Sequence, residues 1–402
     1  MREIPGAWRR AASGAGLLDA HGTVTPTIFA EMSALADRTD AINLGQGFPD
    51  QDGPAEVMEA ARAAISAGVN QYPPGRGMPV LREAIAAHQH RFYGLDADPD
   101  REVLVTAGAT EALAATLLAL IEGPDDEVVV FEPYYDAYAA IVALAGATLV
   151  PVPLSWPTFQ PDVEALARAV TDRTRLILVN DPHNPTGAVF SAEVRAEIVR
   201  LAERHDAIIV TDEVYEHLVF DAQHVPIATL PGAAQRTVSI SSAGKTFSMT
   251  GWKIGWITAP ADLVTAILAV KQFLTYVSGS PFQPAIAVGL GLPDAFFTGI
   301  AATLRVKRDV LGAGLSAAGF DVSAPAGSYF TIADAAPFLA SGMDAGDFCR
   351  GLPARTGVVA IPLTAFASPS RAAPYRTLVR FAACKRVEVL DEASRRLATL
   401  TR

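Results

Sequence analysis

From about residue 100 onward, short runs rich in valine and isoleucine alternate with longer segments of helical pattern. The strand-like runs span residues 102–106, 127–131, 147–153, 175–180, 207–211 and 237–241, and a helical pattern follows each of the first four. Runs of β-branched residues without polar alternation fit strands that are buried on both faces. Strand–helix alternation of this kind predicts an α/β fold with a mainly parallel sheet.

The rest of the chain predicts a second, smaller domain. Hydrophobic residues make up 50% of the 402 residues and charged residues 19%, which suits a large buried core. From about residue 283 helical patterns mix with short strands, and we expect an α+β domain joined to the large one by a helix near 261–277. We expect a flexible lead-in over 1–22, an N-terminal segment of the small domain over 23–50, the large cofactor-binding domain over 51–282, and the small C-terminal domain over 283–402.

Charge, cysteine and hydropathy patterns exclude several classes of function. The net charge of −11 argues against nucleic acid as the main partner, because such binding needs a clustered basic face. Cys349 and Cys384 form no CxxC pair, and the histidines show no ligand spacing, so we expect neither a disulfide framework nor a metal site. Neither a secretory signal nor a run of 18 uncharged apolar residues is present, so we expect no membrane span and a cytoplasmic enzyme.

Segments with polar residues or glycine come directly after five of the predicted strands. Ligands of parallel α/β sheets bind at the carboxyl ends of the strands, so these groups are expected to converge on one ligand. They are the segments 107–110 (AGAT), 132–135 (EPYY), 181–187 (DPHNPTG), 212–215 (DEVY) and 242–245 (SAGK).

Lys245, in the stretch SSAGKTF, has three possible roles: phosphate binding, a covalent bond to a cofactor, or an ordinary surface position. A P-loop needs a glycine six residues before its lysine. That position is Ser239, inside a predicted strand, so the P-loop is disfavoured. Most lysines are solvated, and only the other strand-end groups decide between the surface and covalent roles.

Pyridoxal phosphate needs a lysine for its aldehyde, an acid for its ring nitrogen and donors for its phosphate. The chain offers a candidate for each need. Lys245 is the covalent lysine and Asp212 the partner of the ring nitrogen, while Tyr215 and Asn184 are donors to the phenolic oxygen. The remaining cofactor-binding candidates are Gly108, Ala109, Thr110 and Ser242 for the phosphate, Lys253 as its cation, and Tyr135 as the stacking aromatic.

These motifs resemble those of class I/II aminotransferases of fold type I. The order is NPTG (184–187), DEVY (212–215), SSAGKTFSMTGWKIGW (241–256) and VRF (379–381). The intervals also resemble those of the family: 28 residues separate Asn184 from Asp212, 33 lead on to Lys245, 8 more to Lys253, and 135 separate Lys245 from Arg380. The resemblance covers nearly the whole chain and implies a seven-stranded, mainly parallel sheet with a smaller α+β domain.

The stretches LGQGFPD, NQYPPGRG and FEPYYDAY resemble the group of kynurenine–glutamine transaminases and bacterial N-succinyldiaminopimelate aminotransferases. By this resemblance Gly47 and Asn184 contact the substrate, Arg380 binds its α-carboxylate, and Tyr72 reaches the phosphate of a neighbouring subunit in a homodimer with shared active sites. A guanidinium fork matches a carboxylate bidentately. Lys253 departs from the arginine that many relatives carry, although a lysine can still bind phosphate as a point charge.

The resemblance implies ping-pong transamination, in which Lys245, Asp212 and Tyr215 are catalytic and Lys245 moves the α-proton of the amino acid. The amino donor is expected to be glutamate or glutamine and the acceptor a 2-oxo acid. The best match is an N-succinyldiaminopimelate aminotransferase-like enzyme. The alternatives are a kynurenine/glutamine transaminase with C–S β-lyase activity and, more distantly, a non-catalytic regulatory protein that binds pyridoxal phosphate.

Each assignment has a purely structural alternative. Asp212 could cap a helix, the NPTG segment could be only a tight turn, and Arg380 could form an ordinary salt bridge. Tyr135 and Tyr138 could simply pack, and His183 is expected to be structural. The segment 276–284 holds no second arginine for a distal carboxylate, which leaves Arg76 as a candidate. The aromatic candidates for the substrate pocket are Phe29, Tyr72, Tyr138 and Phe282.

Overall fold

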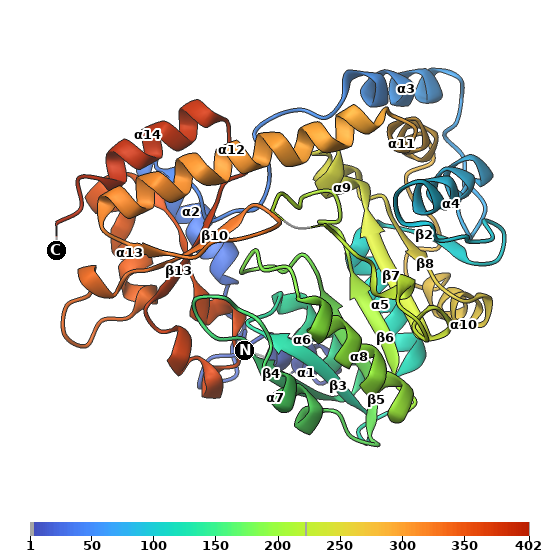
Figure 1. Cartoon of the computed structure of the whole chain (residues 1–402), viewed down its shortest axis with the longest axis horizontal. Coiled ribbons are helices and arrows are strands. Elements are labelled where there is room, and N and C mark those ends of the chain that lie inside the picture. The colour runs from blue at the N-terminus through green and yellow to red at the C-terminus, as the bar shows by residue number, and fades with distance from the viewer. Residues whose placement is uncertain (1–3, 222, 402) are drawn as a thin grey trace.

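The computed structural model, which describes residues 4–221 and 223–401, is built around a seven-stranded mixed sheet (Figure 1). Its strand order is β2-β8-β7-β6-β5-β3-β4, and only β8 runs antiparallel to its neighbours. The strands are β2 (Val103–Thr106), β3 (Glu127–Glu132), β4 (Thr148–Pro153), β5 (Thr174–Asn180), β6 (Ile208–Asp212), β7 (Thr237–Ser242) and β8 (Gly255–Thr258).

All six strands expected from the runs of β-branched residues are present, and the mainly parallel α/β sheet is confirmed. The sequence did not predict β8, whose four residues GWIT lack the run of valine and isoleucine that marks the others. Without β8, β2 and β7 would not be joined, because β8 pairs with both of them.

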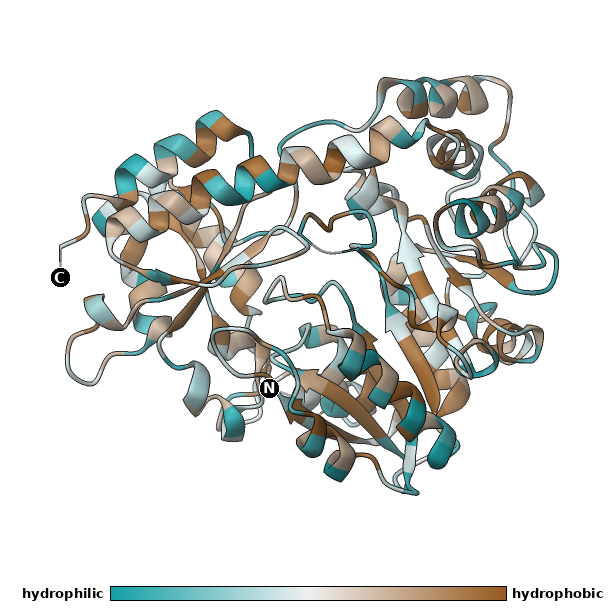
Figure 2. Cartoon of the chain, viewed as in Figure 1, coloured by the Kyte–Doolittle hydropathy of each residue, from teal (hydrophilic) through white to brown (hydrophobic). Residues whose placement is uncertain are grey.

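Helices cover both faces of this sheet, and its strands are mostly hydrophobic, with polar residues in β7 (TVSISS) (Figure 2). One face carries α5 (Gly108–Leu120), α6 (Asp136–Ala145) and α10 (Ala261–Lys271), and the other carries α7 (Val163–Ala169) and α8 (Ala192–Arg204). Ser191 caps α8, as the sequence predicts, because its hydroxyl accepts a hydrogen bond from Val194 N at 3.2 Å.

A third group of helices packs beside β2, at the edge of the sheet (Figure 1). Buried side chains of β2 and β8 join it to the sheet, among them Val103, Val105 and Trp256. These helices are α3 (Ala55–Ser66), α4 (Pro79–Tyr93), α9 (Ala243–Thr246) and α11 (Phe282–Leu290). Short 3₁₀ helices lie in the connections at Ile227–Thr229, Ala234–Arg236, Thr250–Trp252, Ala336–Phe338, Leu363–Phe366, Pro369–Arg371 and Ala373–Tyr375.

The C-terminal part of the chain forms a smaller sheet with its own helices. Four antiparallel strands lie in the order β12-β13-β10-β9, and β1 pairs with β11 nearby. The strands are β1 (Ile42–Asn43), β9 (Asp321–Val322), β10 (Phe330–Asp334), β11 (Val358–Val359), β12 (Ile361–Pro362) and β13 (Leu378–Ala382), and the helices are α2 (Ile28–Thr39), α12 (Asp294–Ala318), α13 (Ala345–Thr356) and α14 (Val387–Leu397). The boundaries expected for the domains, 51–282 and 283–402, stay a prediction.

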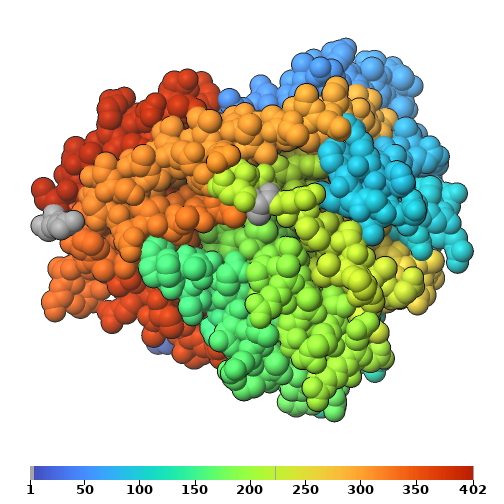
Figure 3. Space-filling view, viewed as in Figure 1, coloured from blue at the N-terminus to red at the C-terminus, as the bar shows by residue number. Residues whose placement is uncertain are grey.

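The helix that links the two sheets is α12, and the expectation of a joining helix near 261–277 is wrong. Helix α10, at that place, packs on α5 of the large sheet because its apolar side chains, such as Val264 and Ile267, belong to the same core cluster. By contrast, α12 packs its first turns on Phe247 of the large part, through Phe296 and Phe297, and its later turns on α14 and β10. In the space-filling view α12 runs along the top of the molecule (Figure 3).

The lead-in expected to be flexible over 1–22 contains a helix that the sequence did not predict, and its flexibility stays a prediction. Helix α1 (Trp8–Gly14) packs on α6. Small residues permit this close approach: a Cβ on Gly14 would lie 2.5 Å from the carbonyl oxygen of Ala139 and 2.6 Å from the Cβ of Ala143. In the sequence, the alanine and glycine residues of this segment suggest a linker. In the structure they form the surface of α1 that contacts α6. Residues 1–3 lie outside the described residues.

Among the described residues, no single helix is long and apolar enough to cross a membrane. Only α11 and α12 taken together meet the length and composition required, and the two helices are bent by 87° at their junction.

We predict that Gly14→Val detaches α1 from α6. The added side chain would overlap the backbone of α6, and overpacking of this kind costs about 1–3 kcal/mol. Hydrogen exchange should show faster exchange of the amides of residues 8–14, with little change in the large sheet. Ser13→Val, on the exposed side of the same helix, is the matched control. Equal exchange in the two variants would contradict the packing role of Gly14.

Candidate active site

Lys245 lies on the one-turn helix α9, directly after β7. Its amino group is 5.8 Å from the ring centre of Tyr215 and 5.9 Å from that of Tyr329. Burial lowers the pKa of Lys245, and the nearby charges of Arg380 and Lys253 lower it further against the opposing effect of Asp212. A lysine in this setting is a better nucleophile and base at neutral pH than a surface lysine.

Asp212 ends β6, next to β7, and its carboxylate is buried. Tyr138 donates a hydrogen bond of 2.6 Å to its Oδ2. Burial raises the pKa of Asp212, while the hydrogen bond from Tyr138 and the charge of Lys245 hold it down. No α-helix begins in residues 213–221, which follow Asp212 directly, so its carboxylate is not a helix cap. The buried carboxylate can therefore face a cationic ring nitrogen.

Arg380 lies on β13 of the small sheet, is 2% exposed, and extends toward the end of β5. Its Nη1 donates to Oδ1 of Asn184 at 3.0 Å and its Nη2 donates to the carbonyl oxygen of Gly45 at 2.6 Å. Its Cζ lies 4.1 Å from the ring centre of Phe330 and 4.5 Å from that of Phe366. Burial lowers the pKa of Arg380 to about 10. The guanidinium is thus fixed between two aromatic rings.

The segment NPTG is both a tight turn and a support for Asn184. The backbone N–H of Asn184 donates to Oδ1 of Asn180 at 2.7 Å, and Nδ2 of Asn180 donates to the carbonyl oxygen of Asp212 at 2.8 Å. Gly187 has φ of +73°, and a Cβ there would lie 2.6 Å from the carbonyl oxygen of Phe330. The turn therefore aims the Asn184 side chain at Arg380 and presses the NPTG segment against β10.

The first turn of α5 forms a cradle with free backbone N–H groups. A Cβ on Gly255 of β8 would lie 2.5 Å from the carbonyl carbon of Gly108 and 2.7 Å from the nitrogen of Ala109, so only glycine permits this approach. A Cβ on Gly108 would lie 3.4 Å from Nζ of Lys253. A helix N-terminus beside an amino group is suited to bind phosphate.

These groups line a cavity of about 230 Å³. It contains all the residues predicted to bind the cofactor except Tyr72: Gly108, Ala109, Thr110, Tyr135, Asn184, Asp212, Tyr215, Ser242, Lys245 and Lys253. Tyr72 does not line this cavity. Its side chain is 83% exposed, and its ring packs edge-on against Tyr276 at 5.7 Å.

A second cavity, of about 390 Å³, opens beside the first and shares Tyr135, Asn184, Tyr215 and Lys245 with it. The three predicted substrate residues, Gly47, Asn184 and Arg380, all line it. A Cβ on Gly47 would lie 2.7 Å from the ring of Phe330, and Tyr329 donates a hydrogen bond to the Gly47 carbonyl oxygen. Position 47, which lies beside Arg380, therefore has no room for a side chain.

The other predicted substrate-pocket residues are scattered. Phe29 lines the second cavity, whereas Phe282 stacks on Trp252 at 4.6 Å and Tyr138 faces Asp212. Arg76 donates to the carbonyl oxygen of Arg101 at 3.2 Å and lines neither cavity. His183 is buried, bonds to Thr186 at 2.8 Å and stacks on Phe190.

The sequence did not predict the contacts that four residues make at the site: Asn180 with Asn184 and Asp212, Tyr138 with Asp212, Tyr329 with Gly47, and Phe330 with Arg380. Asn180 closes the predicted strand 175–180, so its position at a strand end was an available signal. Tyr138 lies one helical turn after the EPYY segment and reaches Asp212 from 74 residues away. Tyr329 and Phe330 come from the small sheet, and only the tertiary fold brings them to the cavity.

Two cations, Lys245 and Arg380, face adjoining cavities with no carboxylate within 4.0 Å in residues 4–221 and 223–401. Nε of Arg380 is buried without a hydrogen-bond partner. Uncompensated buried charges are costly, so the site is built for anionic ligands. A buried lysine beside a phosphate cradle, with an arginine fixed for a carboxylate, defines an enzyme of the aminotransferase type.

Comparison with known proteins agrees with this class. The family described as aminotransferase class I and II matches residues 39–397, so the chain belongs to this family. A Mycobacterium tuberculosis protein described as probable N-succinyldiaminopimelate aminotransferase is 52% identical over 93% of this chain and 96% of its own length.

A solved structure of the N-succinyldiaminopimelate aminotransferase of M. tuberculosis superimposes with a TM-score of 0.91 and 50% identity, over 98% of this chain and 99% of the other. Kynurenine–oxoglutarate transaminase 3 of Mus musculus is 36% identical over 91% of this chain and 86% of its own length. The chain is thus an aminotransferase with a fold type I architecture, as the sequence predicts.

We predict that Tyr138→Phe moves the acid limb of the pH–kcat/KM profile to higher pH. The lost hydrogen bond holds the pKa of Asp212 down, so its removal raises that pKa. Hydrogen bonds to charged groups are worth about 1.5–3 kcal/mol, which corresponds to about one to two pH units. Asp212 acts as a carboxylate, so activity is lost as pH falls through its pKa. Tyr134→Phe, which loses a hydrogen bond to Ser368 instead, is the control. An acid limb at the same pH in both variants would contradict this role of Tyr138.

Proposed function

We propose that the chain is a pyridoxal phosphate-dependent aminotransferase that acts on N-succinyldiaminopimelate, with glutamate as the amino-group partner. The proposal rests on two buried cations that form no salt bridge in the described chain. Lys245 lies at the junction of the two cavities, and Arg380 lies in the second one. Neither has a carboxylate of the described chain within 4.0 Å, although Asp212 acts on Lys245 and Asp136 on Arg380 from farther away. Each cation matches a group of the expected ligands. Lys245 suits the cofactor aldehyde, and Arg380 suits an amino-acid carboxylate.

The 230 Å³ cavity fits pyridoxal phosphate group by group. The N-terminal turn of α5, the hydroxyl of Ser242 and the amino group of Lys253 suit the phosphate. The buried carboxylate of Asp212 suits the ring nitrogen, and Tyr215 and Asn184 suit the phenolic oxygen. When bound, the cofactor supplies an electron-withdrawing ring that stabilises negative charge at the α-carbon of the substrate.

The protein groups then orient the amino acid and move one proton. Arg380, held by Asn184 and two aromatic rings, fixes the α-carboxylate. Lys245 would take the proton from the α-carbon of the substrate and hold it for return, because burial lowers the pKa of its amine. Asp212, whose carboxylate accepts a hydrogen bond from Tyr138, would hold the protonated ring nitrogen of the cofactor.

The choice of substrate rests on relatedness and on the cavity walls. The M. tuberculosis relative is 52% identical, against 36% for the mouse kynurenine transaminase. An aromatic wall of Phe29, Phe48 and Phe330 in the second cavity also favours a second candidate, a kynurenine or glutamine transaminase. Arg76, the sequence candidate for a distal carboxylate, lines neither cavity, so the proposal does not include it. A cytoplasmic location, expected from the sequence, belongs to the same proposal.

A homodimer is also part of the proposal. Large apolar side chains are exposed around Tyr72: Phe273 is 83% exposed, Tyr276 47% and Leu274 45%. Ser280 hydroxyl donates to the carbonyl oxygen of Gln71 at 2.6 Å, so these segments lie together on one surface. Exposed apolar patches of this kind mark interaction sites. A second chain on this surface would bring Tyr72 toward the phosphate cradle of its partner.

We predict that the purified protein bound to pyridoxal phosphate transfers the amino group between glutamate and the 2-oxo form of N-succinyldiaminopimelate with higher kcat/KM than between glutamate and the 2-oxo acid of kynurenine. The measurement is a coupled assay of 2-oxoglutarate formation with both acceptors. A preference for the kynurenine-derived acid would favour the second candidate. No transfer to either acid would remove both substrate assignments.

In the same assay, Lys245→Ala should lower turnover by more than about 10³-fold, because both covalent attachment and proton transfer are lost. Cofactor retained by its phosphate should still be detected after gel filtration, without the visible band of the lysine-bound form. Turnover at the wild-type rate in Lys245→Ala would show that Lys245 has no catalytic role.

We predict that Phe273→Asp converts a dimer into a monomer, since a carboxylate would be buried in the apolar contact. Multi-angle light scattering after gel filtration should give twice the chain mass for the wild type and a single chain mass for the variant. Val306→Asp, at an exposed position of α12, is the control. A wild-type protein with the mass of one chain would contradict the shared-site dimer.

A further inference from the structure

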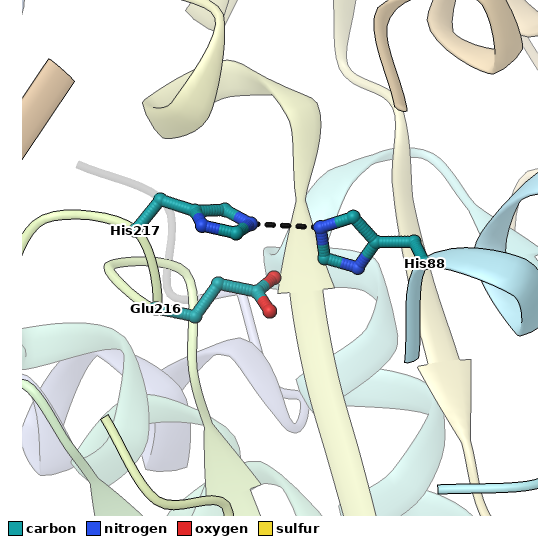
Figure 4. A group of neighbouring side chains, drawn as sticks. All are labelled: His88, Glu216 and His217. Carbon is teal, nitrogen blue, oxygen red and sulfur yellow. Dashed lines mark hydrogen bonds between the residues drawn. The ribbon is translucent and has the colours of Figure 1, made fainter. Parts of the chain in front are cut away.

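Three side chains with metal-binding atoms converge outside the active-site cavities: His88 of α4, and Glu216 and His217 directly after Tyr215 (Figure 4). The two Nε2 atoms are 2.7 Å apart, and one ligand atom of each of the three side chains lies within 4.8 Å of the other two. His88 and Glu216 are 2% and 4% exposed, while His217 is half-buried. None of the three lines either cavity of the active site.

Aromatic rings surround the histidine pair and leave it few other partners. Phe92 lies 4.8 Å from the ring of His88 and 4.9 Å from that of His217, and Phe297 lies 4.5 Å from His217. Nδ1 of His88 is buried without a hydrogen-bond partner, so Nε2 makes the polar contact of this ring. Burial lowers the pKa of both histidines, and a neutral imidazole is the form that binds metal.

Two hydroxyl groups donate hydrogen bonds to the Glu216 carboxylate. Tyr93 hydroxyl donates to Oε2 at 2.7 Å, and Ser241 hydroxyl donates to Oε1. Such outer partners orient carboxylate ligands in metal sites. The guanidinium of Arg91, whose charge acts on both histidines, pairs with Asp294 at 2.8 Å and donates to the carbonyl oxygen of Leu292 at 2.9 Å. One fixed carboxylate and two imidazoles therefore face each other across a confined space.

We propose that His88, His217 and Glu216 bind a zinc ion, with water as the fourth ligand. Two imidazoles and one carboxylate suit Zn²⁺ among the common cations, and three protein ligands leave one position open. Zinc–nitrogen bonds of about 2.0–2.1 Å in a tetrahedron require the two Nε2 atoms to be about 3.3 Å apart. The ion would thus replace the direct histidine contact by a small rotation of the half-buried His217 ring.

The sequence predicts no metal site, because the histidines show no ligand spacing. The fold brings together residues that are 129 positions apart, and the third ligand is the neighbour of the second. Bound zinc would tie α4 to the segment that carries Asp212 and Tyr215, and through Ser241 to β7, which leads to Lys245. The site is therefore a structural clamp outside the active-site cavities and is independent of the substrate assignment.

The test is zinc binding by the holoenzyme. Protein with bound pyridoxal phosphate is treated with EDTA, dialysed against Zn²⁺ without amino acid, and analysed by elemental mass spectrometry and by thermal melting. We expect one zinc ion per chain and a higher melting temperature with zinc. Tyr93→Phe should weaken binding about tenfold, as for the loss of an outer-shell partner, and His217→Ala at least about 100-fold. His90→Ala, which removes an exposed histidine of the same helix, should bind as the wild type does.

Cobalt gives a second readout, because Co²⁺ in a tetrahedral site shows visible absorption bands that depend on its ligands. These bands should appear in the wild type and in His90→Ala and be absent in His217→Ala. Wild-type holoenzyme that binds no zinc beyond the background would overturn the proposal, whatever the variants do. Zinc that binds equally to the wild type and to His217→Ala would overturn it as well, because the ion would then lie elsewhere.

Discussion

The parallel pairing of β5, β6 and β7 is the constraint on which the rest of the site depends. Asn180 pairs with Asp212, and Asp212 pairs with Ile240, so all three strands end at the same edge of the sheet. Successive side chains of a strand point to opposite faces, and a slip of one residue would turn the Asp212 carboxylate to the other face. The register therefore fixes the positions of the acid, the asparagine pair and, one turn after β7, Lys245.

The sequence was informative wherever a signal was local. Runs of valine and isoleucine marked six strands, and the polar segments at their ends supplied the residues that line the 230 Å³ cavity. Signals that depend on tertiary contacts were not available. Tyr138 meets Asp212 across 74 residues, and Phe330 meets Arg380 through the pairing of β10 with β13 in the small sheet. The N-terminal helix was missed for a related reason, because small residues mark a linker and a close helix contact equally well.

The two buried cations, Lys245 and Arg380, depend on the groups that surround them. A buried charge without a partner opposes folding, so the surrounding structure must hold Arg380 and Lys245 in place without a carboxylate. Stacked rings and neutral acceptors do this for Arg380: Phe330 and Phe366 enclose it, and Asn184 and Gly45 accept its hydrogen bonds. Stability is thus supplied by the core, while the charge stays free for a ligand.

Helix α12 is a long helix that contacts the large and the small sheet at its two ends. It has 25 residues, and at 1.5 Å per residue it is about 37 Å long. One end packs on Phe247, two residues after Lys245, and the other packs on the small sheet that carries Arg380. A tilt of about 5° at one end would displace the other by about 3 Å on this length. Midway, Lys307 bonds Gln51 at 2.9 Å, next to the loop with Gly47. A rotation of the small sheet would therefore move α12, and through this helix it would shift both sides of the substrate cavity.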